Sequence, residues 1–194
     1  MPRITPGGAT RTIPGVSDLP ILAIDVDGVI SLFGFETTPP AGSARFELID
    51  GIPHCISLAA GERLLRLSGV FEMVWATGWQ ERANDRLPQI IGIGPLPVIE
   101  IDGPGVAPKS GPAHWKLEPL DRFVGERAVA WIDDSFDQSC FEWAEAREAG
   151  GSPTLLVPTE PDLGLEEGHV AALEYWAGHL ADFRGGVPGG VRNP

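Results

Sequence analysis

Apolar residues occur along the chain in short blocks, and three of these blocks end directly on polar residues. The block at residues 21–24 (I-L-A-I) runs into D-V-D-G, residues 70–76 (V-F-E-M-V-W-A) run into T-G-W, and residues 128–132 (A-V-A-W-I) run into D-D-S. Short apolar runs of this kind are typical of strands that are buried on both faces of a sheet. The pattern predicts two further strands, at residues 97–101 and 154–157.

Longer segments with helical patterns separate these blocks. Ser57 suits the N-cap of the first helix, and Pro88 is expected to end the second. The predicted helices cover residues 58–67, 80–87, a segment from about 112, 138–149 and 166–180. Strands that alternate with helices imply an α/β fold with a parallel sheet and helices on both of its faces.

One insertion follows the first strand. Residues 44–57 alternate between apolar and polar positions around Asp50-Gly51, a dipeptide that favours a tight hairpin turn. We therefore expect a small β-hairpin, which we call the flap, within residues 34–57. For the rest of the chain we expect an irregular arm at residues 1–18, one domain at 19–182 and a flexible tail at 183–194.

Composition excludes several classes of protein. The chain has 194 residues, a formal net charge of -13 and a pI near 4.6, so long-range repulsion disfavours nucleic acid and anionic membranes without ruling out a local basic groove. Cys55 and Cys140 have neither disulfide nor zinc spacing, which predicts buried thiols. The N-terminal residues lack the apolar core of a signal peptide, and no run is long enough to cross a membrane, so we expect a cytoplasmic protein.

The first strand carries the most informative polar residues. Side chains alternate along a strand, so Asp25 and Asp27 should point to one side of the chain. Two adjacent buried carboxylates cost several kcal/mol unless a cation or hydrogen-bond donors compensate them, and a hard divalent ion is the obvious compensation. A turn residue beside Gly28 would explain Asp27 alone, but it would not explain Asp25.

Other polar side chains should gather at the same edge of the sheet. Thr77 follows the second strand and Asp133 with Asp134 follows the fourth, and open α/β sheets bind ligands at the carboxyl edge of their strands. A lysine is expected to join them, either Lys116 or Lys109, and Lys116 is preferred because a helix places a charge more reproducibly than a Pro/Gly loop. Each residue also has an ordinary interpretation, namely a helix cap, a turn or a solvated helix position.

Four tryptophans lie near this edge. Trp75 and Trp131 are within predicted strands and are expected to belong to the core. Trp79 and Trp115 are the candidates for contact with a substrate.

Residues 19–160 resemble the haloacid dehalogenase (HAD) superfamily. The resemblance is carried by D-V-D-G-V-I, the strand that ends at Thr77, Lys116 (or Lys109), and W-I-D-D. The strings W-A-T-G-W and A-V-A-W-I-D-D resemble, more narrowly, the small HAD domains of multidomain RNA-repair proteins. The resemblance implies a three-layer Rossmann-like fold with five parallel strands in the order 5-4-1-2-3. Because the flap is too small to be a cap domain, the site is expected to be capless and open, which suits a large phosphorylated substrate.

The resemblance also implies a reaction, the Mg²⁺-dependent hydrolysis of a phosphomonoester through an aspartyl-phosphate. Asp25 would be the nucleophile and a metal ligand. Asp27 would be the general acid and base, with its backbone carbonyl on the metal. Asp133 and Asp134 would complete the Mg²⁺ site.

The remaining site residues are expected to contact the substrate. Thr77, with Gly78 and Trp79, would bind the phosphoryl group, and Lys116 would hold both the phosphate and Asp25. Two alternatives stay open: an end-processing phosphatase acting on nucleic acid, and a non-catalytic HAD-fold binding module, which the presence of both Asp25 and Asp27 opposes. The sequence names neither the substrate nor the oligomeric state.

Overall fold

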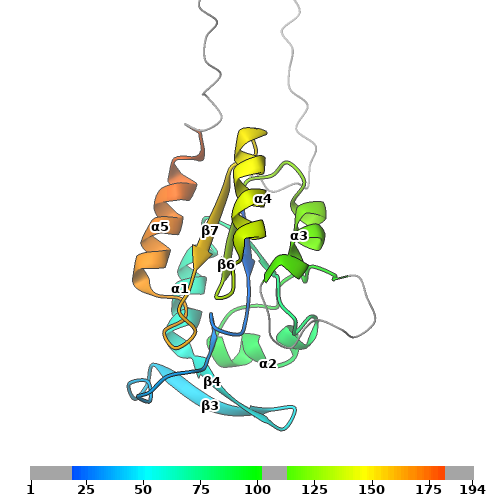
Figure 1. Ribbon diagram of the computed structural model, residues 1–194. Coiled ribbons are helices and arrows are strands. Elements are labelled where there is room, and N and C mark those ends of the chain that lie inside the picture. The colour runs from blue at the N-terminus through cyan, green and yellow to red at the C-terminus, as the bar shows by residue number, and fades with distance from the viewer. Residues whose placement is uncertain (1–18, 102–112, 182–194) are drawn as a thin grey trace, which may run out of the picture.

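A parallel sheet lies at the centre of the computed structural model, which describes residues 19–101 and 113–181 (Figure 1). Its four strands lie in the order β5-β1-β6-β7. Their bounds are β1 (Ile21–Ile24), β5 (Glu72–Trp75), β6 (Val129–Asp133) and β7 (Thr154–Pro158). The α/β class is confirmed, and these four strands have the predicted relative order.

The prediction of a fifth strand at residues 97–101 is wrong. This segment forms a single parallel bridge between Trp75 and Val98, in which Trp75 N–H donates to Pro97 O and Ile99 N–H donates to Trp75 O. The pairing does not extend toward the start of β5, because Pro97 has no N–H to donate to a longer ladder.

Helices cover both faces of the sheet, because the side chains of each strand alternate between the faces. Leu22 and Ile24 pack in one core cluster with residues of α1, α2 and α5, whereas Ile21 and Ala23 pack in another with residues of α3 and α4. The bounds are α1 (Leu58–Leu67), α2 (Arg82–Ile91), the 3-10 helix η1 (Ala113–Lys116), α3 (Leu117–Val124), α4 (Gln138–Ala149) and α5 (Glu167–Gly178). Ser57 caps α1 as expected, since its side chain accepts a hydrogen bond from Ala60 N–H.

The second helix differs from its prediction at both ends. Gln80 has a φ of 53°, so it cannot be the first helical residue, and α2 begins at Arg82. Pro88 does not stop the helix but lies inside it. The last turn is retained because Ile91 is buried in the core, and the helix ends at Gly92, which adopts the left-handed conformation.

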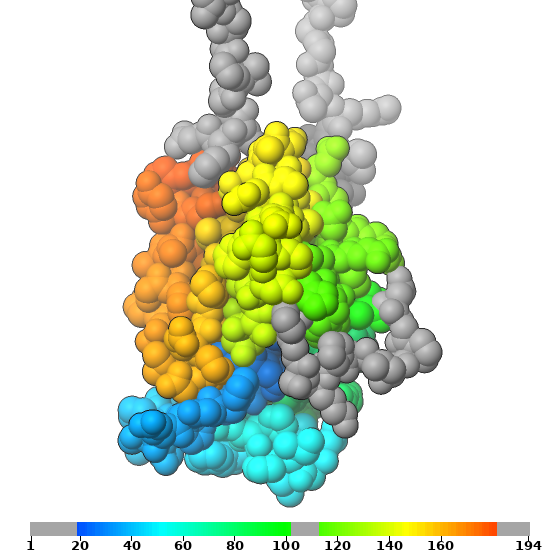
Figure 2. All heavy atoms as spheres, viewed as in Figure 1, coloured from blue at the N-terminus to red at the C-terminus, as the bar shows by residue number. Residues whose placement is uncertain are grey.

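The flap is larger than a hairpin. The turn at Asp50-Gly51 is present, with φ of 53° and 79° at its two residues, as a type I′ turn requires. It joins β3 (Ala44–Ile49) to β4 (Ile52–Ser57), and a short strand β2 (Ser31–Leu32) pairs with β4 to make a three-stranded antiparallel sheet. The flap lies beyond the carboxyl ends of the parallel strands (Figure 1), and the blue segment after β1 packs against it at that end of the molecule (Figure 2).

Several other expectations concern single features. Cys55 and Cys140 are buried free thiols, as predicted. Within residues 19–101 and 113–181, no helix combines the length and the apolar character needed to cross a membrane. The predicted N-terminal arm at residues 1–18 and the predicted tail at 183–194 lie outside the described residues, and the single-domain boundaries stay a prediction.

The fold makes a testable distinction between two helical glycines. A Cβ added at Gly61 of α1 would lie 2.3 Å from the backbone oxygen of Ile91 in α2, whereas a Cβ at Gly168 of α5 would meet nothing within 4 Å. We expect Gly61→Ala to lower the free energy of unfolding by roughly 1–3 kcal/mol through overpacking. Gly168→Ala should raise it by up to about 1 kcal/mol through helix propensity. Urea denaturation measures both, and equal effects would contradict this account of the α1–α2 contact.

Candidate active site

Asp25 is the first residue after β1 and is almost buried, with 7% of its surface exposed. Its Oδ1 accepts a hydrogen bond from Val26 N–H at 2.7 Å, and its Oδ2 lies 2.7 Å from Lys116 Nζ. Its own N–H donates to Ile132 O of β6 at 3.0 Å. The carboxylate is therefore fixed by the strand, by the backbone N–H of Val26 and by a buried cation.

Lys116 is a buried residue of the site and not a solvated helix residue. Only 4% of its surface is exposed, and Nζ lies 2.7 Å from Asp133 Oδ2 as well as from Asp25 Oδ2. Burial opposes the charge of Lys116, but the two carboxylates outweigh this effect and raise its pKa, so the ammonium group stays charged. Lys109, the alternative lysine, lies outside the described residues.

Three carboxylates form a compact group at this edge. Asp25, Asp133 and Asp134 each place one carboxylate oxygen within 4.8 Å of an oxygen of the other two. Asp133 also accepts a hydrogen bond from Ser135 N–H at 3.1 Å. Within the described residues, then, three acidic side chains converge on a region that one lysine partly neutralises.

The protonation behaviour of these acids fits a divalent cation. Burial, followed by repulsion from Asp25, raises the pKa of Asp133 above its ordinary value and raises the pKa of Asp134 to about 6. Crowded carboxylates with raised pKa values favour a cation that neutralises them, and hard oxygen ligands of this kind suit Mg²⁺. The residues therefore fit a bound metal ion of the predicted kind. The side chain of Asp27 is outside this group, and its predicted backbone contribution stays a prediction.

Gly28 gives Asp134 the room that it occupies. The glycine has a φ of 71°, and a Cβ at this position would lie 2.4 Å from Asp134 Cγ. The glycine of D-V-D-G thus does more than turn the chain, because it also allows the acid after β6 to approach the end of β1.

Asp27 has a different environment from Asp25. Strand alternation does not determine the direction of the Asp27 side chain, because β1 ends at Ile24. The residues that follow form a turn, in which Ile30 N–H donates to Val26 O. The side chain of Asp27 is exposed, and its Oδ2 accepts a hydrogen bond from Trp79 Nε1 at 2.8 Å. Partial loss of hydration raises the pKa of Asp27, the bond from Trp79 lowers it, and repulsion from Asp25 raises it.

The turn after β5 positions the remaining predicted residues. Thr77 is fully buried, and its Oγ1 accepts a hydrogen bond from Trp79 N–H at 3.2 Å across Gly78. The turn expected at Thr77-Gly78 is therefore present, and within the described part of the chain the Thr77 hydroxyl donates no hydrogen bond of its own. Trp79 is only 9% exposed. Its predicted contact with substrate, like those of Thr77 and Gly78, stays a prediction.

The other tryptophans divide as expected between core and surface. Trp75 and Trp131 have no exposed surface. Trp115 is partly exposed, and the Nζ of Lys116 lies 5.3 Å from the centre of its ring. Sequence reasoning did not identify His54, whose ring centroid is 4.7 Å from that of Trp79, because nothing in the flap pattern marks it as a neighbour of the site.

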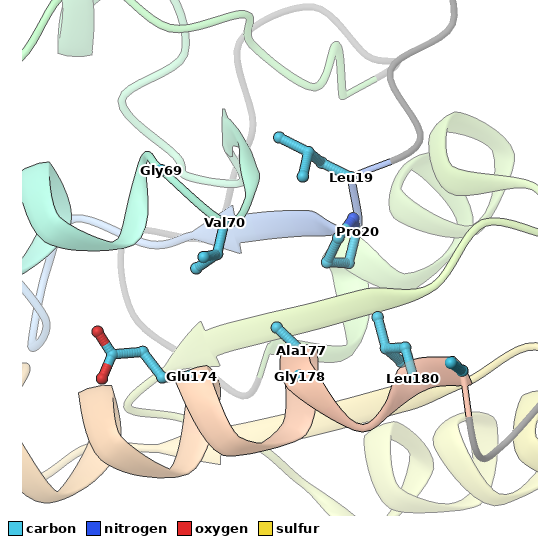
Figure 3. Close-up of a pocket in the computed structure, with 9 residues that line it drawn as sticks. Leu19, Pro20, Gly69, Val70, Glu174, Ala177, Gly178 and Leu180 are labelled. Atoms are coloured by element: carbon cyan, nitrogen blue, oxygen red, sulfur yellow. The ribbon is translucent and has the colours of Figure 1, made fainter.

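A shallow apolar cavity lies elsewhere on the molecule (Figure 3). Its volume is about 540 Å³, and it is lined mainly by Leu19, Pro20, Val70, Ala177 and Leu180. Its acidic residue, Glu174, pairs with Arg66 at 2.8 Å. Because Leu19 and Pro20 precede β1, this cavity is beside the amino end of the strand, whereas the acidic group is at the carboxyl end.

Comparisons with known proteins give distant similarity to solved structures alone. No family model and no curated protein matches the chain. Among solved structures, the chain is similar to Fcp1, an essential RNA polymerase II CTD phosphatase, with a TM-score of 0.41 and 17% identity, over 91% of this chain and 55% of that one. The chain thus spans about half the length of that protein. A similarity at this level does not assign a family or an activity.

The close approach of Gly28 and Asp134 predicts a specific defect. Gly28→Ala and Gly34→Ala both place a side chain at positive φ, which should cost each variant about 1 kcal/mol of stability. A Cβ at Gly34 would meet nothing within 4 Å, so only Gly28→Ala should displace Asp134. We expect Gly28→Ala to weaken Mg²⁺ binding by roughly tenfold or more, with Gly34→Ala unchanged. Calorimetric titration tests this, and equal affinities would show that Asp134 is not a ligand.

The raised pKa of Asp134 predicts a pH dependence. The pKa of Asp134 is about 6 in the folded protein, against 3.8 for an ordinary aspartate. The raised pKa contributes to the stability of the folded state at low pH, and this contribution is lost as the pH rises through about 6. Mg²⁺ needs the deprotonated carboxylate, so its apparent affinity should increase between about pH 5 and pH 7, and binding near pH 6 should release protons. Titration in buffers of different ionisation enthalpy measures the release, and Asp134→Asn should reduce it. Binding without proton release would contradict the prediction.

Proposed function

We propose that this protein is a Mg²⁺-dependent phosphomonoester hydrolase of the HAD type. The observation that carries the proposal is the position of Lys116 Nζ, 2.7 Å from Asp25 on one side and 2.7 Å from Asp133 on the other. A phosphate ester is an anion that a carboxylate nucleophile repels, so the site needs positive charge beside the nucleophile. The resemblance of the four sequence motifs to the HAD superfamily supports the same reaction.

The proposed reaction has two steps. A carboxylate oxygen of Asp25 attacks phosphorus, the bond from phosphorus to the leaving oxygen breaks, and Asp27 gives its proton to that oxygen. Water then attacks the aspartyl-phosphate and gives a proton to Asp27. The bond between phosphorus and Asp25 breaks, so that phosphate leaves and both aspartates return to their starting state.

The other residues stabilise charge and position the substrate. Asp25, Asp134 and Asp133 would hold Mg²⁺ together with the backbone carbonyl of Asp27, and the bound ion supplies neutralisation of the phosphoryl oxygens. Lys116 adds a second positive charge. Thr77, at the end of β5, would donate its hydroxyl proton to a phosphoryl oxygen.

The flap bears on the choice of substrate. It is a three-stranded sheet at one end of the molecule, too small to enclose a substrate as a cap domain would. We therefore expect a large phosphorylated substrate. The net charge of -13 disfavours nucleic acid. A screen over sugar phosphates, nucleotides, phosphopeptides and phosphorylated oligonucleotides would identify the class.

The mechanism predicts different outcomes for the two aspartates. Asp25→Asn should lose at least roughly 10⁴-fold in kcat on p-nitrophenyl phosphate, because an amide is a poor nucleophile. Asp27→Asn should lose roughly 10²- to 10⁴-fold on an alkyl phosphate while keeping its Mg²⁺ affinity, since its backbone carbonyl is unchanged. Asp85→Asn, an exposed acid on α2, is the matched control and should behave as the parent protein.

Two results would count against the proposal. Full turnover by Asp25→Asn would exclude the aspartyl-phosphate. Mg²⁺ binding with no hydrolysis of any substrate in the screen would instead favour the alternative of a non-catalytic binding module.

A further inference from the structure

Asp27 is an exposed side chain with one specific hydrogen-bond partner. Within the described residues, its carboxylate accepts a hydrogen bond from Trp79 Nε1, at 2.8 Å from Oδ2, and from no other donor. An exposed carboxylate without such a donor samples several rotamers. The indole N–H is a donor only, so it holds one oxygen of Asp27 and leaves Oδ1 available.

Trp79 is itself held in place from two directions. Its backbone N–H donates to Thr77 Oγ1 at 3.2 Å in the turn after β5. Its ring meets the ring of His54 edge to face, with centroids 4.7 Å apart, and His54 Nδ1 lies 2.9 Å from Ser31 Oγ. Because His54 belongs to β4 and Ser31 to β2, the flap packs directly on the side chain that holds Asp27.

We propose that Trp79 is a positioning residue for Asp27, and that His54 of the flap keeps Trp79 in the position this requires. The inference rests on the proposed function, in which Asp27 gives a proton to the leaving oxygen. Trp79 Nε1–H fixes Oδ2, so that Oδ1 is the oxygen presented to the substrate. The flap thereby contributes to the chemistry through a packing contact, without touching the reacting atoms.

This role predicts a loss that depends on the leaving group. An alkyl phosphate needs a proton on its leaving oxygen as the bond to phosphorus breaks, whereas the p-nitrophenolate ion is stable without one. A wrongly oriented Asp27 should therefore slow the first substrate much more than the second. The parameter kcat/KM reports this step, because it covers the reaction up to the first irreversible event.

The test replaces each of two tryptophans by phenylalanine. Trp79→Phe keeps a ring against His54 but removes the N–H, and we expect kcat/KM to fall about tenfold to a hundredfold on glycerol phosphate and about threefold or less on p-nitrophenyl phosphate. Trp75→Phe is the matched control, because it also removes a buried indole N–H, which donates to Asn84 Oδ1 at 2.9 Å. It should show no dependence on the leaving group.

A second variant tests the contribution of the flap. His54→Ala should give a smaller loss with the same dependence on the leaving group, and it should add little in the Trp79→Phe background, because both changes act through one side chain. It also keeps the proposal testable if Trp79→Phe does not fold. A loss that is equal on the two substrates, or no loss at all, in either variant would overturn the proposal.

Failure of this inference and failure of the proposed function are distinguishable. If Asp25→Asn is inactive and Asp27→Asn shows the leaving-group effect, but Trp79→Phe behaves as the parent protein, the positioning role alone is overturned. Full activity of Asp25→Asn would overturn the proposed function, and the positioning role would fall with it.

Discussion

The interaction on which the rest of the site depends is the ion pair that Lys116 makes with two buried carboxylates, Asp25 and Asp133. The register of the sheet creates the need for it: Ile24 of β1 is paired with Ile132 of β6, so the acids that follow lie side by side at the same level. Two like charges in a desolvated position would cost several kcal/mol without a cation. Lys116 supplies that cation from the connection between β5 and β6. Ala113 N–H donates to Ser135 O at 2.7 Å, which ties the start of η1 to the loop after β6 and brings Lys116 between the acids.

Much of this arrangement could be predicted from the sequence, because buried parallel strands have a strong apolar signal and the site residues directly follow them. The four strands were predicted for this reason. The flap turn was predicted from the dipeptide Asp50-Gly51, and the relative order of the strands from the resemblance to the HAD superfamily. The apolar pattern does not predict elements whose formation depends on tertiary contacts. The two-residue strand β2 is too short to have a pattern, and residues 97–101 look like a strand although β5 offers them a single residue to pair with. Pro88 stays inside α2 because burial of Ile91 retains the last turn.

The gathering of Asp25, Asp133 and Asp134 and the contact of Lys116 with Asp25 were predictable, but the contacts of Gly28 and Trp79 were not. The spacing D-V-D-G indicates a turn at Gly28, but it gives no indication that Asp134, more than one hundred residues later, needs the space that a side chain would fill. In the same way, Trp79 was expected to face a substrate, since an aromatic residue after a strand end suits that role. Its bond to Asp27 depends on how the turn after β5 meets the segment after β1, which local sequence does not encode.

The two aspartates of the motif are held by different kinds of contact, and this difference suits the different work proposed for them. Asp25 is buried and lies 2.7 Å from the Nζ of Lys116, so its position is fixed, as a nucleophile requires. Asp27 reaches solvent and is held by one neutral donor, so it can lose and regain a proton without breaking an ion pair. A lysine beside Asp27 would stabilise its carboxylate and oppose proton donation, whereas an indole N–H orients it with a much weaker bias. The contact with Trp79 therefore provides orientation at low electrostatic cost, which is the combination that a general acid needs.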